Sequence, residues 1–243
     1  MILSIMYTDP RGGHNHKFFN KDFFKVWSPQ MAYVLGYLYA DGAIEDVRIS
    51  SRTCYTTMTS VDHGLLDKIR GTLSSNHNIY TRKERLCTFP SGKIYLCRES
   101  YTLRIGSKSM FDDLIELGLT PRKSLTLEFP KIPKNLLSYF IRGYFDGDGC
   151  VMVSVDKGKI LPSIKTVFTC GSEKFLSELN SILLSITKSQ IKNVVHGAHA
   201  FQLCYKKYDS LKVLNFMYNG LNNAPFLERK YDIYQKYLLT IQN

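Results

Sequence analysis

Apolar and polar residues alternate along several short segments of the chain, and this period of two predicts β-strands. In residues 54–59 the polar face is formed by Tyr55, Thr57 and Thr59. Residues 94–105 divide into Tyr95, Cys97, Tyr101, Leu103 and Ile105 on an inward face and Arg98, Ser100, Thr102 and Arg104 on an outward face. We therefore expect half-buried strands that each present one polar face to solvent.

Other segments have the period of an amphipathic helix. Residues 61–75 place Leu65, Leu66, Ile69 and Leu73 on one side. Ser28 and Pro29 form a helix start, with Ser as N-cap and Pro in the first turn, and that helix is expected to run to about Ala40. Further helices are predicted at 107–117, from about 135 to 149, and at 172–186, 207–218 and 225–241, and further strands at 47–52, 78–88, 150–157, 163–170, 191–196 and 199–205.

Two of the predicted helices carry the same unusual pattern, in residues 34–42 and 140–149. Each has two small residues four positions apart, and each ends in Asp-Gly. The small residues are Gly36 and Ala40 in the first copy and Gly143 and Gly147 in the second. Residues four apart share one helix face, so each helix has a flat stripe against which another helix can pack closely.

The Asp-Gly endings place a carboxylate at the C-terminus of each helix. Gly42 and Gly149 are expected to adopt the left-handed turn that ends many helices. Asp41 and Asp148 then lie where the helix dipole and the free carbonyls are already negative. If the two stripes pack together, the carboxylates converge, and two such charges about 6 Å apart repel by roughly 2.8 kcal/mol at an effective dielectric of about 20. A hard divalent cation would relieve this repulsion.

The spacing of residues around the two stretches indicates an internal duplication. Asp41 and Lys123 are 82 positions apart (123 − 41), and so are Asp148 and Lys230 (230 − 148). The repeating unit is therefore 107 residues long (148 − 41), with the order helix–strand–strand–helix–strand–strand–helix. We divide the chain into an N-terminal extension at 1–27, a first repeat at 28–117, a linker at 118–134 and a second repeat at 135–243.

Composition limits the class of protein and its partners. The 243 residues carry a formal net charge of +11, which favours a polyanionic partner over a merely basic soluble protein. The six cysteines form no Cys-x-x-Cys pair, so neither a zinc site nor a disulfide framework is expected, and a reducing compartment fits. No apolar run is long enough for a membrane span, and Met1–Met6 is too short for a secretion signal. We expect an intracellular protein, cytoplasmic or organellar, that does not bind membranes.

The two Asp-Gly stretches resemble the signature helices of the LAGLIDADG homing endonucleases, in the single-chain form with two motifs. The resemblance covers nearly all of the chain after residue 27. It implies an α+β fold of two pseudo-symmetric αββαββα repeats, with the signature helices packed at the repeat interface and antiparallel sheets forming a DNA-binding saddle. It also implies a monomeric, intron-encoded meganuclease that makes a double-strand break in a long target site in double-stranded DNA.

The resemblance assigns a catalytic role to a few residues. Asp41 and Asp148 would each bind Mg²⁺ with the carbonyl of the preceding residue, Ala40 or Gly147, and each would serve one DNA strand. The metal would activate water and stabilise the leaving 3′-oxygen; Mn²⁺ or Ca²⁺ would substitute for binding. Lys123 and Lys230 fall where the family places a basic residue near the attacking water, with their neighbours Arg122 and Arg229 as possible substitutes.

The outward strand faces supply the residue types that read DNA bases. The candidate DNA contacts are Arg48, Ser50, Arg52, Tyr55, Thr57, Arg98 and Arg104 in the first half and Ser154, Asp156, Lys165, Lys192 and Gln202 in the second. For any one of these residues, the alternative is a side chain on the solvated face of a half-buried sheet.

The sequence departs from the family pattern at two pairs of positions. Where family members often have Gln at the end of the second strand, this chain has Ser60 and Cys170, which brings the shell that orders the water into question. The residue before the second small position is Tyr39 in one helix and Asp146 in the other, which we interpret as asymmetry between the helices. An asymmetric chain implies a non-palindromic target.

Two other functions are compatible with the same scaffold. One is a maturase that binds the RNA of a group I intron, and the other is a DNA-binding regulator that does not cut. The presence of both Asp41 and Asp148 argues against the regulator and, less strongly, against a maturase without nuclease activity.

Overall fold

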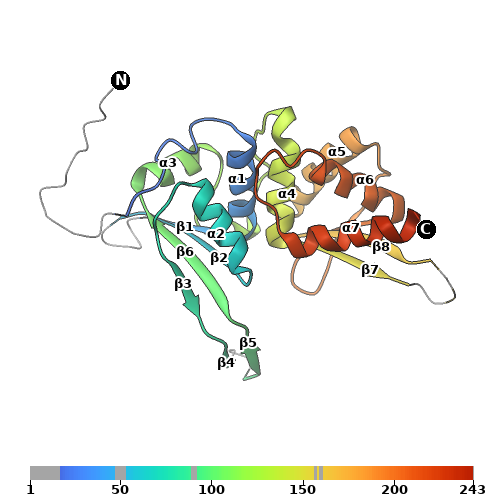
Figure 1. Ribbon diagram of the computed structural model, residues 1–243, viewed down its shortest axis with the longest axis horizontal. Helices are drawn as coiled ribbons and strands as arrows, with labels where there is room; N and C mark the ends of the chain where they lie inside the picture. Colours follow the sequence, from blue (N-terminus) through green and yellow to red (C-terminus); the bar gives the residue numbers. More distant parts are fainter. Residues whose placement is uncertain (1–16, 47–52, 89–91, 156–157, 159–160, 243) are drawn as a thin grey trace, which may run out of the picture.

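The computed structural model describes residues 17–46, 53–88, 92–155, 158 and 161–242. Two four-stranded antiparallel sheets lie on either side of a central pair of helices, and the remaining helices pack against the sheets (Figure 1). The predicted α+β architecture is confirmed. Among the helices of the described residues, none has the length and apolar character to cross a membrane.

The first repeat forms a sheet with the strand order β1-β2-β6-β3. Its elements are α1 (Pro29–Asp41), β1 (Gly42–Glu45), β2 (Tyr55–Ser60), α2 (His63–Thr72), β3 (Ile79–Arg82), β6 (Ser100–Gly106) and α3 (Lys108–Glu116). An additional hairpin, β4 (Arg85–Thr88) and β5 (Ile94–Cys97), is inserted between β3 and β6.

The second repeat has the equivalent strand order, β7-β8-β10-β9. Its elements are α4 (Leu137–Asp148), β7 (Gly149–Ser154), β8 (Ser163–Cys170), α5 (Glu173–Thr187), β9 (Val194–His196), β10 (Phe201–Lys206) and α6 (Lys207–Tyr218), followed by α7 (Glu228–Gln242). Two short 3₁₀ helices, η1 (Lys123–Leu125) and η2 (Lys134–Leu136), lie in the connection between the repeats. The duplication expected from the spacing is thus visible in the topology of the two sheets.

The predicted strand at 94–105 is wrong in one respect, because it is two strands separated at Arg98 and Glu99. Leu103 and Ile105 are buried as expected, whereas Tyr95 is 52% exposed, because β5 pairs only with β4 and has no helix beneath it. The predicted strand at 78–88 divides into β3 and β4 in the same way. In Figure 1 this hairpin extends away from the helices at the end of the β3–β6 pair.

Helices α1 and α4 pack directly through their stripes of small residues. A Cβ atom on Gly36 would lie 2.0 Å from the carbonyl oxygen of Phe140, and one on Gly143 would lie 2.0 Å from that of Tyr33. A Cβ on Gly147 would lie 2.4 Å from the Cβ of Ala40. Only glycine permits this approach at these positions, so the expected close contact between the two helices is confirmed.

The expected left-handed turn at the end of each helix is wrong. Gly42 has φ −91° and ψ 153°, and Gly149 has φ −96° and ψ 162°, so both are extended and begin strands β1 and β7. Glycine is required here for space: a Cβ would lie 2.5 Å from the carbonyl oxygen of Leu38 at Gly42 and of Phe145 at Gly149. The chain therefore passes straight from each signature helix into the first strand of its sheet.

This packing predicts a large stability difference between glycines that look alike in sequence. We expect Gly143→Ala to lower the free energy of unfolding by about 3 kcal/mol or more, because its methyl group would overlap the backbone of α1. Gly71→Ala is the matched control: Gly71 is in helix α2 with no atom near its Cβ position, and alanine favours helices.

Urea unfolding of the two variants and the parent protein measures this difference. Equal stability of Gly143→Ala and the parent would contradict the close approach of α1 and α4.

Candidate active site at the base of the helix pair

The two aspartates lie at the same end of the α1–α4 pair, each as the last residue of its helix. Both side chains are exposed to solvent. A Cβ atom added to Gly147, the residue before Asp148, would lie 3.4 Å from the Oδ2 atom of Asp41. The glycine contact between the helices therefore brings the two carboxylates together, as the sequence predicted.

The electrostatic effects on these carboxylates agree with this placement. Burial among protein atoms raises the pKa of Asp41, and the positive charges of Lys230 and Lys123 oppose that shift. Burial and the negative charge of Asp41 raise the pKa of Asp148 to about 6, again opposed by the two lysines. Although water reaches both side chains, the surrounding protein still disfavours their charged forms.

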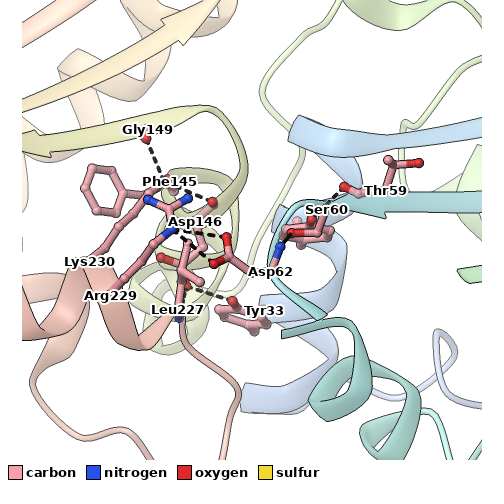
Figure 2. A network of polar contacts seen from close by, with 11 residues as sticks. Tyr33, Thr59, Ser60, Asp62, Phe145, Asp146, Gly149, Leu227, Arg229 and Lys230 are labelled. Atoms are coloured by element: carbon pink, nitrogen blue, oxygen red, sulfur yellow. Dashed lines mark hydrogen bonds and ion pairs between the residues drawn. The ribbon is translucent and has the colours of Figure 1, made fainter. Parts of the chain in front are cut away.

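Both candidate lysines are buried, and each donates hydrogen bonds to the backbone at the end of the signature helix that precedes it in the chain. The Lys123 ammonium lies 3.0 Å from the carbonyl oxygen of Ala40 and 2.6 Å from that of Gly42. The Lys230 ammonium lies 2.5, 2.9 and 2.6 Å from the carbonyl oxygens of Phe145, Asp146 and Gly149 (Figure 2). These cations cap helix C-termini, which is where a positive charge is stabilising.

The two lysines differ in how many hydrogen-bond donors remain available for a substrate. An ammonium group has three N–H donors. Lys230 uses all three on backbone carbonyls, whereas Lys123 uses two, leaving one N–H without a partner among the described residues. Burial lowers the pKa of Lys123 and lowers that of Lys230 to about 8. Lys123 can therefore still donate to a substrate oxygen or water, while Lys230 can act only through its charge.

The neighbouring arginines do not take equivalent positions. The Nε atom of Arg229 lies 3.2 and 3.1 Å from the two carboxylate oxygens of Asp62, across the repeat interface (Figure 2). Arg122 is exposed, with a left-handed backbone (φ 58°) at the start of η1. The Arg229 side chain is thus already paired with a carboxylate of the other repeat.

Ser60 and Cys170 lie at the ends of equivalent strands and make equivalent contacts. The Oγ of Ser60 accepts a hydrogen bond from the Asp62 amide at 3.0 Å, and the Sγ of Cys170 accepts one from the Ser172 amide at 3.4 Å. Each side chain therefore stabilises the turn from strand to helix. Beside them, the hydroxyls of Tyr37 and Tyr144 donate to the carbonyls at positions 59 and 169, so each signature helix is fastened to the strand end of its own repeat.

In the first sheet, three candidate DNA contacts share one face. Tyr55 and Thr57 of β2 are in register with Gly106 and Arg104 of β6. The Arg104 guanidinium lies 3.8 Å from the centre of the Tyr55 ring and pairs with Glu45 at 2.8 Å. Arg104 is thereby held on the face opposite the buried side chains. Arg98 is exposed between β5 and β6, outside the sheet itself.

In the second sheet, Ser154, Lys165 and Gln202 share one face by register, because Lys165 pairs with Met152 and Lys206, and Ser154 pairs with Ser163. Lys192 is not brought to this face. It precedes β9, and its ammonium pairs with Asp209 of α6 at 2.7 Å.

Four candidates, Arg48, Ser50, Arg52 and Asp156, lie outside the described residues.

The inserted hairpin is the main feature that sequence reasoning missed. Its base and strands carry exposed basic residues at Arg82, Lys83, Arg85 and Lys93. The four consecutive charged residues at 82–85, of which three are basic, are the signal that would have marked this segment as solvated.

The donor chemistry at the helix ends suits a hard cation. Asp41 and Asp148 offer carboxylate oxygens, and the Ala40 carbonyl, which has two lone pairs, accepts one hydrogen bond from Lys123. Oxygen donors of this kind match Mg²⁺ or Ca²⁺. Among the described residues, no group of three or more His, Cys, Asp and Glu side chains forms a metal cluster, so a cation here would complete its coordination with water or a substrate oxygen.

Comparison with known proteins supports this architecture. Residues 135–204 match the family model of a LAGLIDADG-like domain. No curated protein sequence matches the chain.

Three solved structures illustrate the likeness of fold, each over most of both chains. The meganuclease I-SmaMI bound to uncleavable DNA has a TM-score of 0.58 at 12% identity, covering 89% of this chain and 92% of its own. The homing endonuclease I-WcaI bound to its DNA recognition sequence has a TM-score of 0.55 at 14% identity, covering 88% and 91%. The I-LtrWI LAGLIDADG homing endonuclease bound to target DNA has a TM-score of 0.52 at 14% identity, covering 92% and 91%.

The raised pKa of Asp148 predicts a gain in stability from its removal. Between pH 4 and 6 the folded protein holds a proton on Asp148 that the unfolded chain has already released, so stability falls as pH rises through this window. We expect Asp148→Asn to have a higher Tm than the parent at pH 7.5 in EDTA, with the difference shrinking toward pH 4.

Thermal unfolding across this pH range tests the expectation, with Asp232→Asn on the exposed surface of α7 as the control that leaves Tm unchanged. A Tm for Asp148→Asn at or below the parent value at pH 7.5 would show that Asp148 is not in a repulsive environment.

Proposed function

Because the chain carries a LAGLIDADG-like domain and has the two-repeat LAGLIDADG fold, we propose that it is a site-specific DNA endonuclease. It makes a double-strand break in a long, non-palindromic target by metal-dependent hydrolysis of one phosphodiester bond in each strand. The observation that carries this proposal is the convergence of Asp41 and Asp148, open to solvent, at the junction of two repeats that each present a polar sheet face.

The residues at the junction divide the chemistry between them. Asp41 and Asp148, with the carbonyls of Ala40 and Gly147, would hold a divalent cation such as Mg²⁺, which would supply Lewis-acid chemistry and lower the pKa of a bound water. Mn²⁺ or Ca²⁺ would serve for binding. Cleavage needs the cation and both carboxylates, whereas binding of the duplex does not, because binding relies on basic side chains away from this site.

The lysines complete the site in different ways. Lys123 has a donor available, so it can orient the attacking water or a non-bridging phosphate oxygen by a hydrogen bond. Lys230 has none, so it stabilises the negative charge that develops in the transition state through its field. The two strands therefore meet chemically different sites within one protein.

The sheet faces and the hairpin account for recognition. Lys165 and Gln202 in one repeat and Arg104 in the other can reach base edges or phosphates, since Arg and Lys read guanine and Gln reads adenine. The net charge of +11 supplies the attraction to the phosphate backbone that positions the duplex. Because the two faces carry different residues, a single chain would read two different half-sites as a monomer.

A DNA-binding regulator that does not cut is the weaker alternative. A regulator of this kind does not need two carboxylates that repel each other and are open to solvent. An intron maturase would bind RNA on the same faces, and the experiment below separates it from the nuclease.

The role proposed for Asp41 predicts a defect in strand cleavage when this residue is replaced. A randomised duplex library is incubated with the protein in Mg²⁺, and the cleaved sequence is recovered and labelled on both strands. We expect Asp41→Asn to bind this duplex as the parent does but to cut one or both strands at least about 100-fold more slowly, because a metal ligand is lost. Asp232→Asn on the exposed surface of α7 should behave as the parent.

Undiminished cleavage of both strands by Asp41→Asn would refute the assignment of the site. A library that stays intact in Mg²⁺ while structured intron RNA is bound would refute the nuclease and favour the maturase.

Phosphate contacts predict that the affinity for DNA falls steeply as the salt concentration rises. If the sheets and hairpin contact about 6 to 10 phosphates, affinity for the selected duplex falls by roughly 10³ to 10⁵ between 50 and 200 mM salt. Replacing Lys165 with Gln should weaken binding and make the slope shallower by about one unit if its ammonium contacts phosphate. Fluorescence anisotropy at several salt concentrations in Ca²⁺ measures the slope, and Lys108→Gln, on the outer helix α3, is the control that leaves it unchanged. An affinity independent of salt would exclude DNA as the partner.

A further inference from the structure

Asp146 occupies an unusual position for a carboxylate. It is two residues before Asp148 on α4, yet its side chain turns away from the base of the helix pair and is only 3% exposed. The equivalent residue of the first repeat is Tyr39. A buried carboxylate is costly unless its oxygens are satisfied, so its contacts are informative.

One carboxylate oxygen joins three separate elements. The Oδ2 atom of Asp146 accepts a hydrogen bond from the Tyr33 hydroxyl of α1 at 2.7 Å and another from the Leu227 amide at 2.8 Å (Figure 2). Its Oδ1 atom is buried without a partner among the described residues. The side chain thus links α4 to α1 and to the segment that leads into α7.

The bond to Leu227 fixes the start of the helix that carries Lys230. The Leu227 carbonyl accepts the first backbone bond of that turn, from the Lys230 amide at 3.1 Å. The main-chain carbonyl of Asp146 also accepts a hydrogen bond from the Lys230 ammonium. Asp146 therefore restrains Lys230 at two points. Its carboxylate accepts a hydrogen bond from the backbone three residues before Lys230, and its main-chain carbonyl accepts one from the Lys230 ammonium.

The first repeat has no equivalent arrangement. The hydroxyl of Tyr39 donates to the carbonyl of Leu117, six residues before Lys123. Lys123 lies in the short η1 helix and makes two carbonyl contacts rather than three. The tight fixation of the lysine is specific to the second repeat.

Two ion pairs to the first repeat also restrain the start of α7. Arg229 pairs with Asp62 of the first repeat, and Glu228 pairs with Lys68 at 2.6 Å. In both pairs at least one partner is well exposed to solvent, and ion pairs that solvent reaches contribute little. The buried bond from Asp146 is therefore a stronger restraint on the backbone that leads to Lys230 than either ion pair.

We propose that Asp146 is a positioning residue for Lys230, and that it thereby sets the rate at which one of the two DNA strands is cut. The inference rests on the proposed nuclease function. Lys230 acts through its charge alone, and the field it exerts on a scissile phosphate depends on its distance. A shift of about 1 Å in a supporting group can cost roughly 100-fold in rate.

The experiment uses the full-length protein and the duplex that the parent cleaves, labelled on both strands. Asp146→Leu removes both hydrogen-bond acceptors, and Asp146→Ala is a smaller second variant in case the first does not fold. Asp146→Asn keeps an oxygen that accepts the Leu227 amide. Tyr33→Phe is the matched control, because it removes the other hydrogen bond to the same oxygen without affecting the segment that carries Lys230.

We expect Asp146→Leu or Asp146→Ala to bind the duplex as the parent does and to cut one strand about 10- to 100-fold more slowly, with the other strand unaffected. Asp146→Asn and Tyr33→Phe should cut both strands at close to the parent rate. In a Lys230→Met background, Asp146→Leu should cause no further slowing of the affected strand, because it acts only through that lysine.

Equal slowing of both strands, or slowing that adds to that of Lys230→Met, would overturn the inference and show a general structural role for Asp146. Unchanged cleavage of both strands by Asp146→Leu would overturn it as well. If the parent protein cleaves no duplex from the library, it is the proposed nuclease function that fails, which is a different result.

Discussion

The backbone contact between α1 and α4 is the constraint on which the rest of the structure depends. Gly36 and Gly143 each meet a carbonyl oxygen of the opposite helix, at a distance that excludes any larger residue. Because the helices run directly into β1 and β7, this one contact also fixes how the two sheets lie relative to each other. The same geometry forces Asp41 and Asp148 together, so the fold and the candidate chemistry have a common physical origin.

The structure offsets only part of the electrostatic cost of this arrangement. Lys123 and Lys230 cap the helix C-termini, which neutralises carbonyl charge at the end where the aspartates lie. The repulsion between the aspartates remains, and the pKa of Asp148 is still raised to about 6. Natural proteins keep such unfavourable local arrangements at functional sites and stabilise them elsewhere. The aromatic core around the helix pair supplies that stability here.

Much of this could be predicted from sequence, because small residues four apart and a spacing of 82 residues reflect local geometry and duplication. The extended conformation of Gly42, the burial of Lys230 and the link between Asp146 and Leu227 could not, since each depends on atoms brought together from distant segments. The hairpin β4–β5 was not separated from β3 and β6, because its strands carry apolar residues that the sequence cannot distinguish from buried ones. The sequence shows that Asp146 differs from its equivalent Tyr39, but the partners of Asp146 follow only from the tertiary structure.

The central claim is that the glycine contact holds Asp41 and Asp148 close enough to interact. A ¹³C NMR titration of the Asp148 carboxyl group, without divalent cations, in the parent protein and in Asp41→Asn, tests it most directly. The account predicts a pKa of about 6 in the parent and a lower pKa in the variant, because the variant removes a neighbouring negative charge. A pKa for Asp148 near 4 that does not respond to the Asp41 substitution would contradict it.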